Sequence, residues 1–171
     1  MAEQPELRSR MRELFIQAGT FHSKLIKGKE AEGQKYKDYF DWSEPVKTVP
    51  SHRILALRRA EKEIILTLDI EVPEDNAIRI LEELYIKGSN PSSDQVRQAA
   101  ADAFKRLIKP SMETEIRLLT KKQADTEAIR VFADNARQLL LAAPVGQKRI
   151  MAIDPGFRTG CKLVCLDDQG Q

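Results

Sequence analysis

The sequence predicts a mainly α-helical fold, in which a multi-helical domain with one long helix precedes a single β-hairpin. Three observations support this prediction. Apolar residues recur at spacings of three and four in several segments between residues 5 and 141. Neither glycine nor proline interrupts residues 111–141. After Gly146 the pattern changes to two short apolar runs that are typical of strands.

The first part of the chain is expected to form two helices joined by irregular segments. Residues 5–18 carry one apolar stripe that ends at Gly19, as in an amphipathic helix. Residues 21–35 carry only scattered apolar side chains, so we expect an irregular connection there. A second helix is predicted over residues 51–62, with Ser51 as its N-cap.

The middle of the chain is expected to alternate between a strand and helices. The β-branched run 64–68 is short enough to be a strand. Pro73 is expected to be the first residue of a helix. The pair Ser92–Gln95 has the spacing of a capping box and predicts another helix start. Pro110 is expected to interrupt that helix.

Residues 111–141 allow one long helix, and an alternative with a break at residues 123–126 stays open because the apolar stripe is thin there. The predicted hairpin follows. Residues 149–154 and 161–167 read as strands, and the residues between them are rich in turn-forming types.

The most aromatic stretch of the chain contains Tyr36, Tyr39, Phe40 and Trp42. Aromatic side chains between lysines can stack on exposed nucleic-acid bases. Aromatic residues at spacings of three and four are more often the buried face of a helix. We favour the interpretation that they belong to the core.

The net charge of +2 is too small to indicate a nucleic-acid partner by itself. Residues 1–62 contain 13 Lys and Arg against 9 Asp and Glu, whereas the remainder contains 15 against 17. Solvated helix faces often produce such an asymmetry. The basic residues of this first part are nevertheless the best candidates for contacts with phosphates: Lys27, Lys29, Lys35, Lys37, Arg53, Arg58, Arg59 and Lys62.

Neither a disulfide nor a metal or cofactor site is expected. Cys161 and Cys165 would lie about 13 Å apart on one face of a strand, which is too far for a disulfide. Their reduced thiols are consistent with a cytoplasmic protein. His22 and His52 stand alone, without the spacing of a metal site. No apolar run is long enough for a membrane span, so we expect no membrane partner.

Asp154 ends the first predicted strand and is followed by Pro155 and Gly156. Such an aspartate most often begins a turn. It is also the position at which a ribonuclease H-like fold places its first metal-binding carboxylate, in enzymes that use two metals to hydrolyse phosphodiesters.

Three segments resemble the Tex family of bacterial transcriptional accessory proteins, and they occur in consistent order and spacing. Residues 147–162 resemble the start of the YqgF-like, or RuvC-like, domain of that family, and residues 28–40 and 50–63 resemble two further Tex signatures. The resemblance implies a large cytoplasmic protein with helical regions, a YqgF-like domain, helix-hairpin-helix elements and an S1 domain, which binds nucleic acid and is connected with transcription.

This resemblance also implies a domain division. Residues 1–143 would form a helical Tex-type domain, with a candidate helix-turn-helix around residues 51–86. Residues 149–171 would be the incomplete start of the YqgF-like domain. Since the chain ends after one hairpin and Asp154 has no carboxylate partners there, we expect no enzymatic activity, and a metal-dependent nuclease is the least supported function.

The leading functional hypothesis is a non-catalytic scaffold that binds nucleic acid, with the choice between RNA and DNA left open. The alternative is a protein-interaction module, in which the long helix contacts RNA polymerase or other Tex domains. A lone hairpin is marginal in water and has unpaired edges. We therefore expect it to be disordered, to pack on the helices, or to mediate self-association with another copy.

Overall fold

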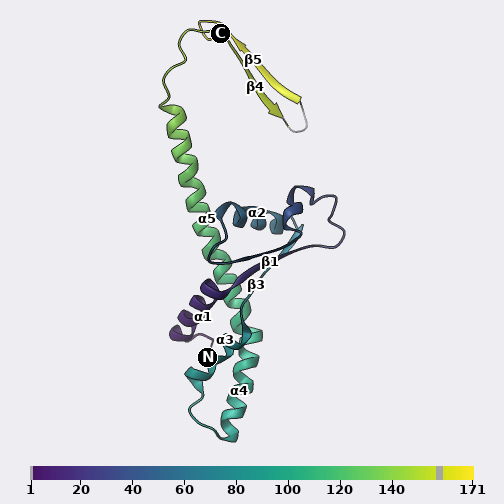
Figure 1. Cartoon of the computed structure of the whole chain (residues 1–171), viewed down its shortest axis with the longest axis vertical. Helices are drawn as coiled ribbons and strands as arrows, with labels where there is room; N and C mark the ends of the chain where they lie inside the picture. The colour runs from purple at the N-terminus through teal and green to yellow at the C-terminus, as the bar shows by residue number, and fades with distance from the viewer. Residues whose placement is uncertain (1, 157–159) are drawn as a thin grey trace. The chain divides into compact units, whose positions relative to one another are not determined.

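Strand β1 (Thr20–Leu25) is the middle strand of a three-stranded antiparallel sheet with the order β2–β1–β3. The computed structural model describes residues 2–156 and 160–171. Strand β2 (Asp41–Pro45) pairs with one edge of β1, and strand β3 (Leu66–Glu71) pairs with the other edge (Figure 1). The sequence did not predict β1 or β2, because neither segment has the continuous apolar or β-branched pattern of a typical strand.

One face of this sheet is buried. Side chains alternate between the two faces of a strand, so every second residue points into the core. Leu66, Leu68 and Ile70 of β3 are buried, and Phe21 lies opposite Ile70 in the register. The buried polar residue on this face is Ser23, whose hydroxyl donates a 2.7 Å hydrogen bond to the carbonyl oxygen of Tyr39. That bond removes most of the cost of burying a hydroxyl.

Helix α1 (Pro5–Ala18) buries its predicted stripe and is held to its neighbours by ion pairs. It packs against helix α3 (Glu74–Tyr85), to which Arg10 is joined through Glu83. Two further arginines of α1, Arg8 and Arg12, both bind Glu115 on the long helix, and the Arg8 contact measures 2.6 Å.

The aromatic residues that follow β1 belong to the core, as favoured from the sequence. The short helix η1 (Gln34–Tyr39) buries Tyr36, and Tyr39, Phe40 and Trp42 pack against the same core cluster. Just before it, Gly33 passes close to Ile65. A Cβ atom at this glycine would lie 2.6 Å from Ile65 Cγ2 and 2.9 Å from the carbonyl oxygen of Lys29. A side chain there would displace the loop that carries the basic residues.

Three helical segments follow one another without a break: α4 (Pro91–Ala103), η2 (Phe104–Ile108) and α5 (Lys109–Leu140). The interruption predicted at Pro110 is therefore wrong. The reason is that η2 is a π-helical turn, in which Lys109 N–H bonds the carbonyl oxygen of Phe104, five residues earlier. This wider turn accommodates a proline that lacks a backbone donor. The long helix is also continuous through residues 123–126.

Two of the predicted helix caps differ from the structure. Helix α2 (Ser51–Lys62) has Pro50 at its N-cap position, and the Ser51 hydroxyl instead bonds Glu127 of α5. Helix α4 is capped by Asn90, whose side chain accepts a 2.9 Å bond from Ser93 N–H. Asn90 immediately precedes a proline at the first helical position, and it takes the role expected of the capping box.

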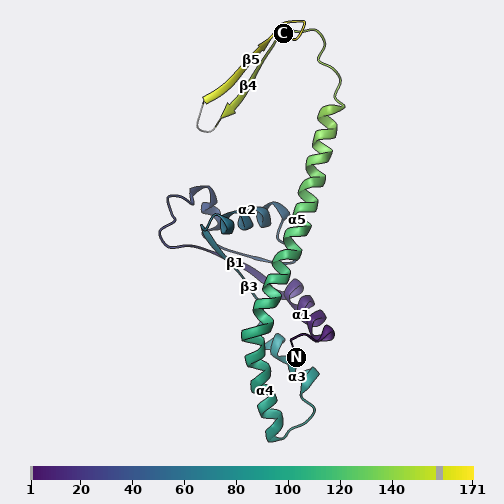
Figure 2. The same ribbon diagram turned by 180° about the vertical axis from the view of Figure 1, so that it is seen from behind.

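The chain divides into two compact units, Met1–Val131 and Phe132–Gln171. The second unit contains the end of α5 and an antiparallel hairpin of β4 (Ile150–Gly156) and β5 (Gly160–Leu166) (Figure 2). The mainly helical fold with a long helix and a C-terminal hairpin is thus confirmed. The segment 51–86, the candidate helix-turn-helix, folds as α2, β3 and α3 in that order.

Substitutions of two phenylalanines test which part of the continuous helical segment stabilises the first unit. Phe104 of η2 is 2% exposed, whereas Phe132 is 74% exposed. We expect Phe104→Ala to lower the free energy of unfolding by about 3–5 kcal/mol, because it leaves a cavity in the core. The matched control Phe132→Ala should change it by no more than about 0.5 kcal/mol. Urea denaturation followed by circular dichroism measures both, and equal losses would contradict the assignment of Phe104 to the core.

Candidate nucleic-acid interface

A groove of about 580 Å³ lies between α2 and α5 within the first unit. In both ribbon views one end of α2 lies beside α5, and the rest of α2 extends away from it (Figures 1 and 2). The lining of the groove combines one apolar residue, four cationic residues and two acidic ones: Leu55, Arg58, Arg59, Lys62, Lys121, Glu63 and Asp125. We call these seven residues the α2–α5 groove.

The spacing of residues on each helix explains why these side chains converge. Residues 55, 58, 59 and 62 follow one another at intervals of three, one and three on α2, so they share one face of that helix. The opposite face of α2, which carries Ile54, Leu57 and Ala60, is buried in the core. Lys121 and Asp125 are four residues apart on α5 and so face the same way. The α2 face was among the sequence-predicted candidates, but Lys121 was not.

Several of the charges in and beneath the α2–α5 groove are already paired. Lys121 Nζ lies 2.5 Å from Asp125 Oδ2. Arg58 contacts Glu61 one turn along α2, and Glu61 also receives Arg117 of α5 at 2.7 Å.

Arg59 and Lys62 differ from these residues. Within the described part of the chain, neither forms a direct ion pair, although the charge of Arg59 contributes to the lowered pKa of Glu63. They are therefore the cations of the groove that are most available to a ligand.

The remaining predicted residues lie outside the groove lining. Lys29 pairs with Glu32 at 2.7 Å, and Arg53 pairs with Glu44 of β2 at 2.6 Å. Lys27 and Lys37 are exposed, and among the described residues no ion pair involves them. The structure thus brings together three of the eight predicted residues, and the other five lie outside the groove lining.

Lys35 lies outside the groove lining but contacts one of its residues, Glu63. Its Nζ lies 2.8 Å from Glu63 Oε2, and it also sits 5.0 Å from the centre of the Tyr36 ring. The hydrogen bond from Lys35 lowers the pKa of Glu63, with smaller contributions from Tyr36 and the charge of Arg59. The same contact with Glu63 raises the pKa of Lys35. One of the two acidic groups of the groove is therefore neutralised from outside it.

The hairpin places Asp154 in β4 with its side chain exposed, 3.8 Å from Lys162 Nζ. Cys161 and Cys165 are free and exposed on β5. Among residues 2–156 and 160–171, no three His, Cys, Asp or Glu side chains are grouped as a metal site would require. Part of the turn in the resembling segment, residues 157–159, lies outside the described residues. No helix in the described part is both long and apolar enough to cross a membrane.

Comparison with known proteins places this arrangement in a family. Residues 1–132 match the family described as Tex central region-like. The chain belongs to the Tex family.

Relatives of this Tex chain match it over almost its whole length. It is 35% identical to Protein tex of Bordetella pertussis and 36% identical to the transcriptional accessory protein Tex of Neisseria gonorrhoeae, over 99% of the chain in both cases. It is 29% identical, over 94% of its length, to S1 RNA-binding domain-containing protein 1 of Pongo abelii. The chain spans 23% of each of the two bacterial relatives and 17% of the third.

The contact between Lys35 and Glu63 gives this Tex chain a testable pH dependence. Because the pKa of Glu63 is lowered, the contribution of its charge to folding is present above the ordinary carboxyl pKa and is lost as the pH falls through the lowered value. We expect Lys35→Gln to raise the pKa of Glu63 towards its ordinary value. An NMR titration that follows the carboxyl carbon of Glu63 measures this pKa.

Lys37→Gln is the matched control, because Lys37 lies in the same short helix and has no ion pair among the described residues. This variant should leave the pKa of Glu63 unchanged. An equal effect of the two substitutions would show that general surface charge, and not the Lys35 contact, sets that pKa.

Proposed function

We propose that the chain is a non-catalytic scaffold that binds nucleic acid within a larger transcription accessory factor. The observation that carries this proposal is the surplus of cations in the α2–α5 groove, where four basic side chains face two acidic ones. The names of the bacterial and primate relatives support it, because they refer to transcription and to an S1 RNA-binding domain.

Phosphate is the chemical group that such a groove fits best. Arginine forms two parallel hydrogen bonds with phosphate oxygens, and lysine binds them as a point charge. Phosphates are common to RNA and DNA, so the groove supports binding of either. Contacts of this kind position a protein on the strand and carry no sequence information of their own.

The basic residues around the groove would extend this surface. Lys27 and Lys37 are exposed and would reach phosphates directly. Lys29, Lys35 and Arg53 would contribute less, because each already holds a carboxylate. Exchanging one ion pair for another at the surface yields only a small net gain.

A second candidate function is supported by the apolar surface of α5. Ile129, Phe132, Leu139 and Leu140 are between 68% and 85% exposed, and their spacing places them near one face of the helix. An exposed apolar face is typical of a helix that binds another protein surface. RNA polymerase or another domain of the same factor would be the partner in this alternative.

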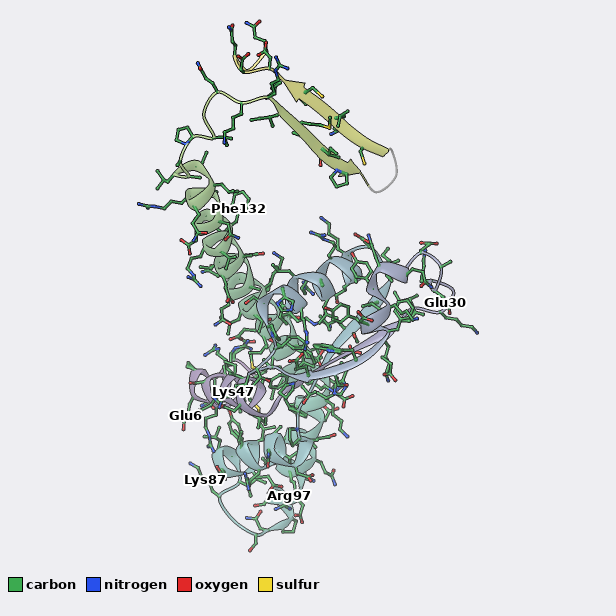
Figure 3. All side chains as sticks on the ribbon, turned by 45° about the horizontal axis from the view of Figure 1, so that its top comes forward. Glu6, Glu30, Lys47, Lys87, Arg97 and Phe132 are labelled. Atoms are coloured by element: carbon green, nitrogen blue, oxygen red, sulfur yellow. The ribbon has the colours of Figure 1, made fainter. Side chains whose placement is uncertain are left out.

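Substitution of Lys62 tests the first function. We expect Lys62→Gln to weaken binding of a labelled 20-nucleotide strand about tenfold at 50 mM salt, and to reduce the slope of log affinity against log salt by about 0.7–0.9, because one phosphate contact is lost. Lys87→Gln is the matched control, since Lys87 is exposed after α3 and lies away from the α2–α5 groove (Figure 3). Fluorescence anisotropy at 50–200 mM salt measures both.

The same titration separates the two functions. Absence of nucleic-acid binding at 50 mM salt, together with binding to purified RNA polymerase that Leu139→Asp abolishes, would favour the interaction module over the nucleic-acid scaffold.

The non-catalytic part of the proposal has its own check. Asp154 is an exposed carboxylate whose partner is Lys162, whereas a two-metal site requires several carboxylates around the metals. Incubation of the chain with a labelled strand and magnesium should leave the strand intact. Cleavage that Asp154→Asn abolishes would contradict this part of the proposal.

A further inference from the structure

The α2–α5 groove contains an anion of its own, the carboxylate of Asp125. Lys121 Nζ lies 2.5 Å from Asp125 Oδ2, so Lys121, like Arg58, is engaged before any ligand arrives. We propose that a phosphodiester group displaces Asp125 from Lys121 and is then held by Lys121, Arg59 and Lys62. This inference rests on the proposed function, and it adds the ligand chemistry and the internal competitor of the site.

Two arginines share a carboxylate beneath the surface of the groove. Glu61 binds two guanidinium groups at once, those of Arg58 and Arg117, and Arg117 also lies 4.0 Å from the carboxylate of Asp69. The side chains of Arg58, Glu61 and Arg117 are only 21–26% exposed. The Nε atoms of both arginines are buried without a hydrogen-bond partner in the described part. This network holds Arg58 beside Glu61, so among the described residues the unpaired positive charge of the groove lining comes from Arg59 and Lys62.

Two of the cations above this network are available to the ligand. Arg59 and Lys62 are three residues apart on α2, so their Cβ atoms are about 5–6 Å apart. Neither has an ion pair among the described residues, as noted above. Lys121 faces them across the groove from α5. A phosphate that entered between the helices would therefore meet donors from both sides.

Replacing Asp125 by a phosphate group at Lys121 costs little free energy. The side chains of Lys121 and Asp125 are 42% and 44% exposed, and ion pairs of this exposure contribute little to stability. Once displaced, the carboxylate of Asp125 can turn towards solvent because its side chain is already partly exposed. The effect of Asp125 is thus to lower the affinity for phosphate without closing the groove.

The lining favours the backbone of a strand over its bases. Leu55 is the apolar residue of the groove, and none of the seven lining residues is aromatic, so a base has no ring on which to stack. No asparagine or glutamine lines the groove to pair with adenine. Arg58, which could otherwise recognise guanine, is held by Glu61. We therefore expect similar affinities for thymidine and adenosine homopolymers.

The test compares two aspartates that hold the same kind of contact. Asp125→Asn removes the internal competitor. Asp102→Asn is the matched control, because Asp102 forms an ion pair with Arg106 four residues later on the same continuous helix, outside the groove. The two variants have the same change in net charge. Binding of a labelled 12-nucleotide thymidine strand is measured by fluorescence anisotropy for each variant, and again in a Lys121→Gln background.

We expect Asp125→Asn to strengthen binding on the order of two- to fivefold, the range that corresponds to a surface ion pair. Asp102→Asn should have no effect beyond the change in net charge. In the Lys121→Gln background the gain from Asp125→Asn should fall to that of Asp102→Asn, because Asp125 and Lys121 then no longer interact. A gain from Asp125→Asn that equals that of Asp102→Asn in the presence of Lys121, or one that stays above it without Lys121, would overturn the inference while leaving the proposed function intact.

A separate measurement covers the case in which the chain binds no strand and the proposed function fails. Pyrophosphate is titrated into the ¹⁵N-labelled chain, and amide shifts are followed by NMR. Shifts confined to residues 55–63 and 121–125 would support a site for free phosphate groups, with the same displacement of Asp125. No shift in these segments would overturn the inference on this source as well.

Discussion

The pairing of β1 with two neighbours is the constraint on which the first unit of the molecule depends. β1 pairs with β2 on one edge and with β3 on the other, so it joins segments that are up to 51 residues apart in sequence, as Thr20 and Glu71 are. Its inward side chains, Phe21 and Ser23, lie under the helices that cover the sheet. The hydrogen bond of Ser23 to the Tyr39 carbonyl then fixes the connection between β1 and β2. Helix α2 leads directly into β3, so the position of the groove follows from the sheet.

The helices could be predicted from the sequence because each one carries its own evidence. An apolar stripe every three or four residues is visible within α1, α2 and α5 without any knowledge of their partners. Strands β1 and β2 carry no such local evidence. His22, Ser23 and Lys24 look like a solvated loop, and they are held in a strand only by pairing with distant residues. The turn at Phe104–Ile108 was missed for a related reason, since a proline two residues later normally ends a helix.

The candidate site could be predicted only in part. Arg58, Arg59 and Lys62 belong to one helix face that the sequence shows directly, and the structure places them at one groove. The lysines of the preceding loop are similar in sequence, but acidic neighbours occupy two of them. Lys121 and Asp125 could not have been found, because nothing in the sequence shows that this part of α5 crosses α2. Charge alone was therefore a poor guide, and the position of each charge relative to a carboxylate mattered more.

The π-helical turn fixes the number of residues that the chain can have between Phe104 and Ile108. Buried residues recur every four positions from Ala100 to Ile116, although four residues in an α-helix overshoot a full turn by about 40°. The wider turn compensates for part of this drift. Loss of a single residue from Phe104–Ile108 would rotate Met112 and Ile116 by about 100° and carry them out of the core. Insertions and deletions should thus be tolerated in the connection before Pro91 but not in this turn, even though both lie far from the groove in sequence.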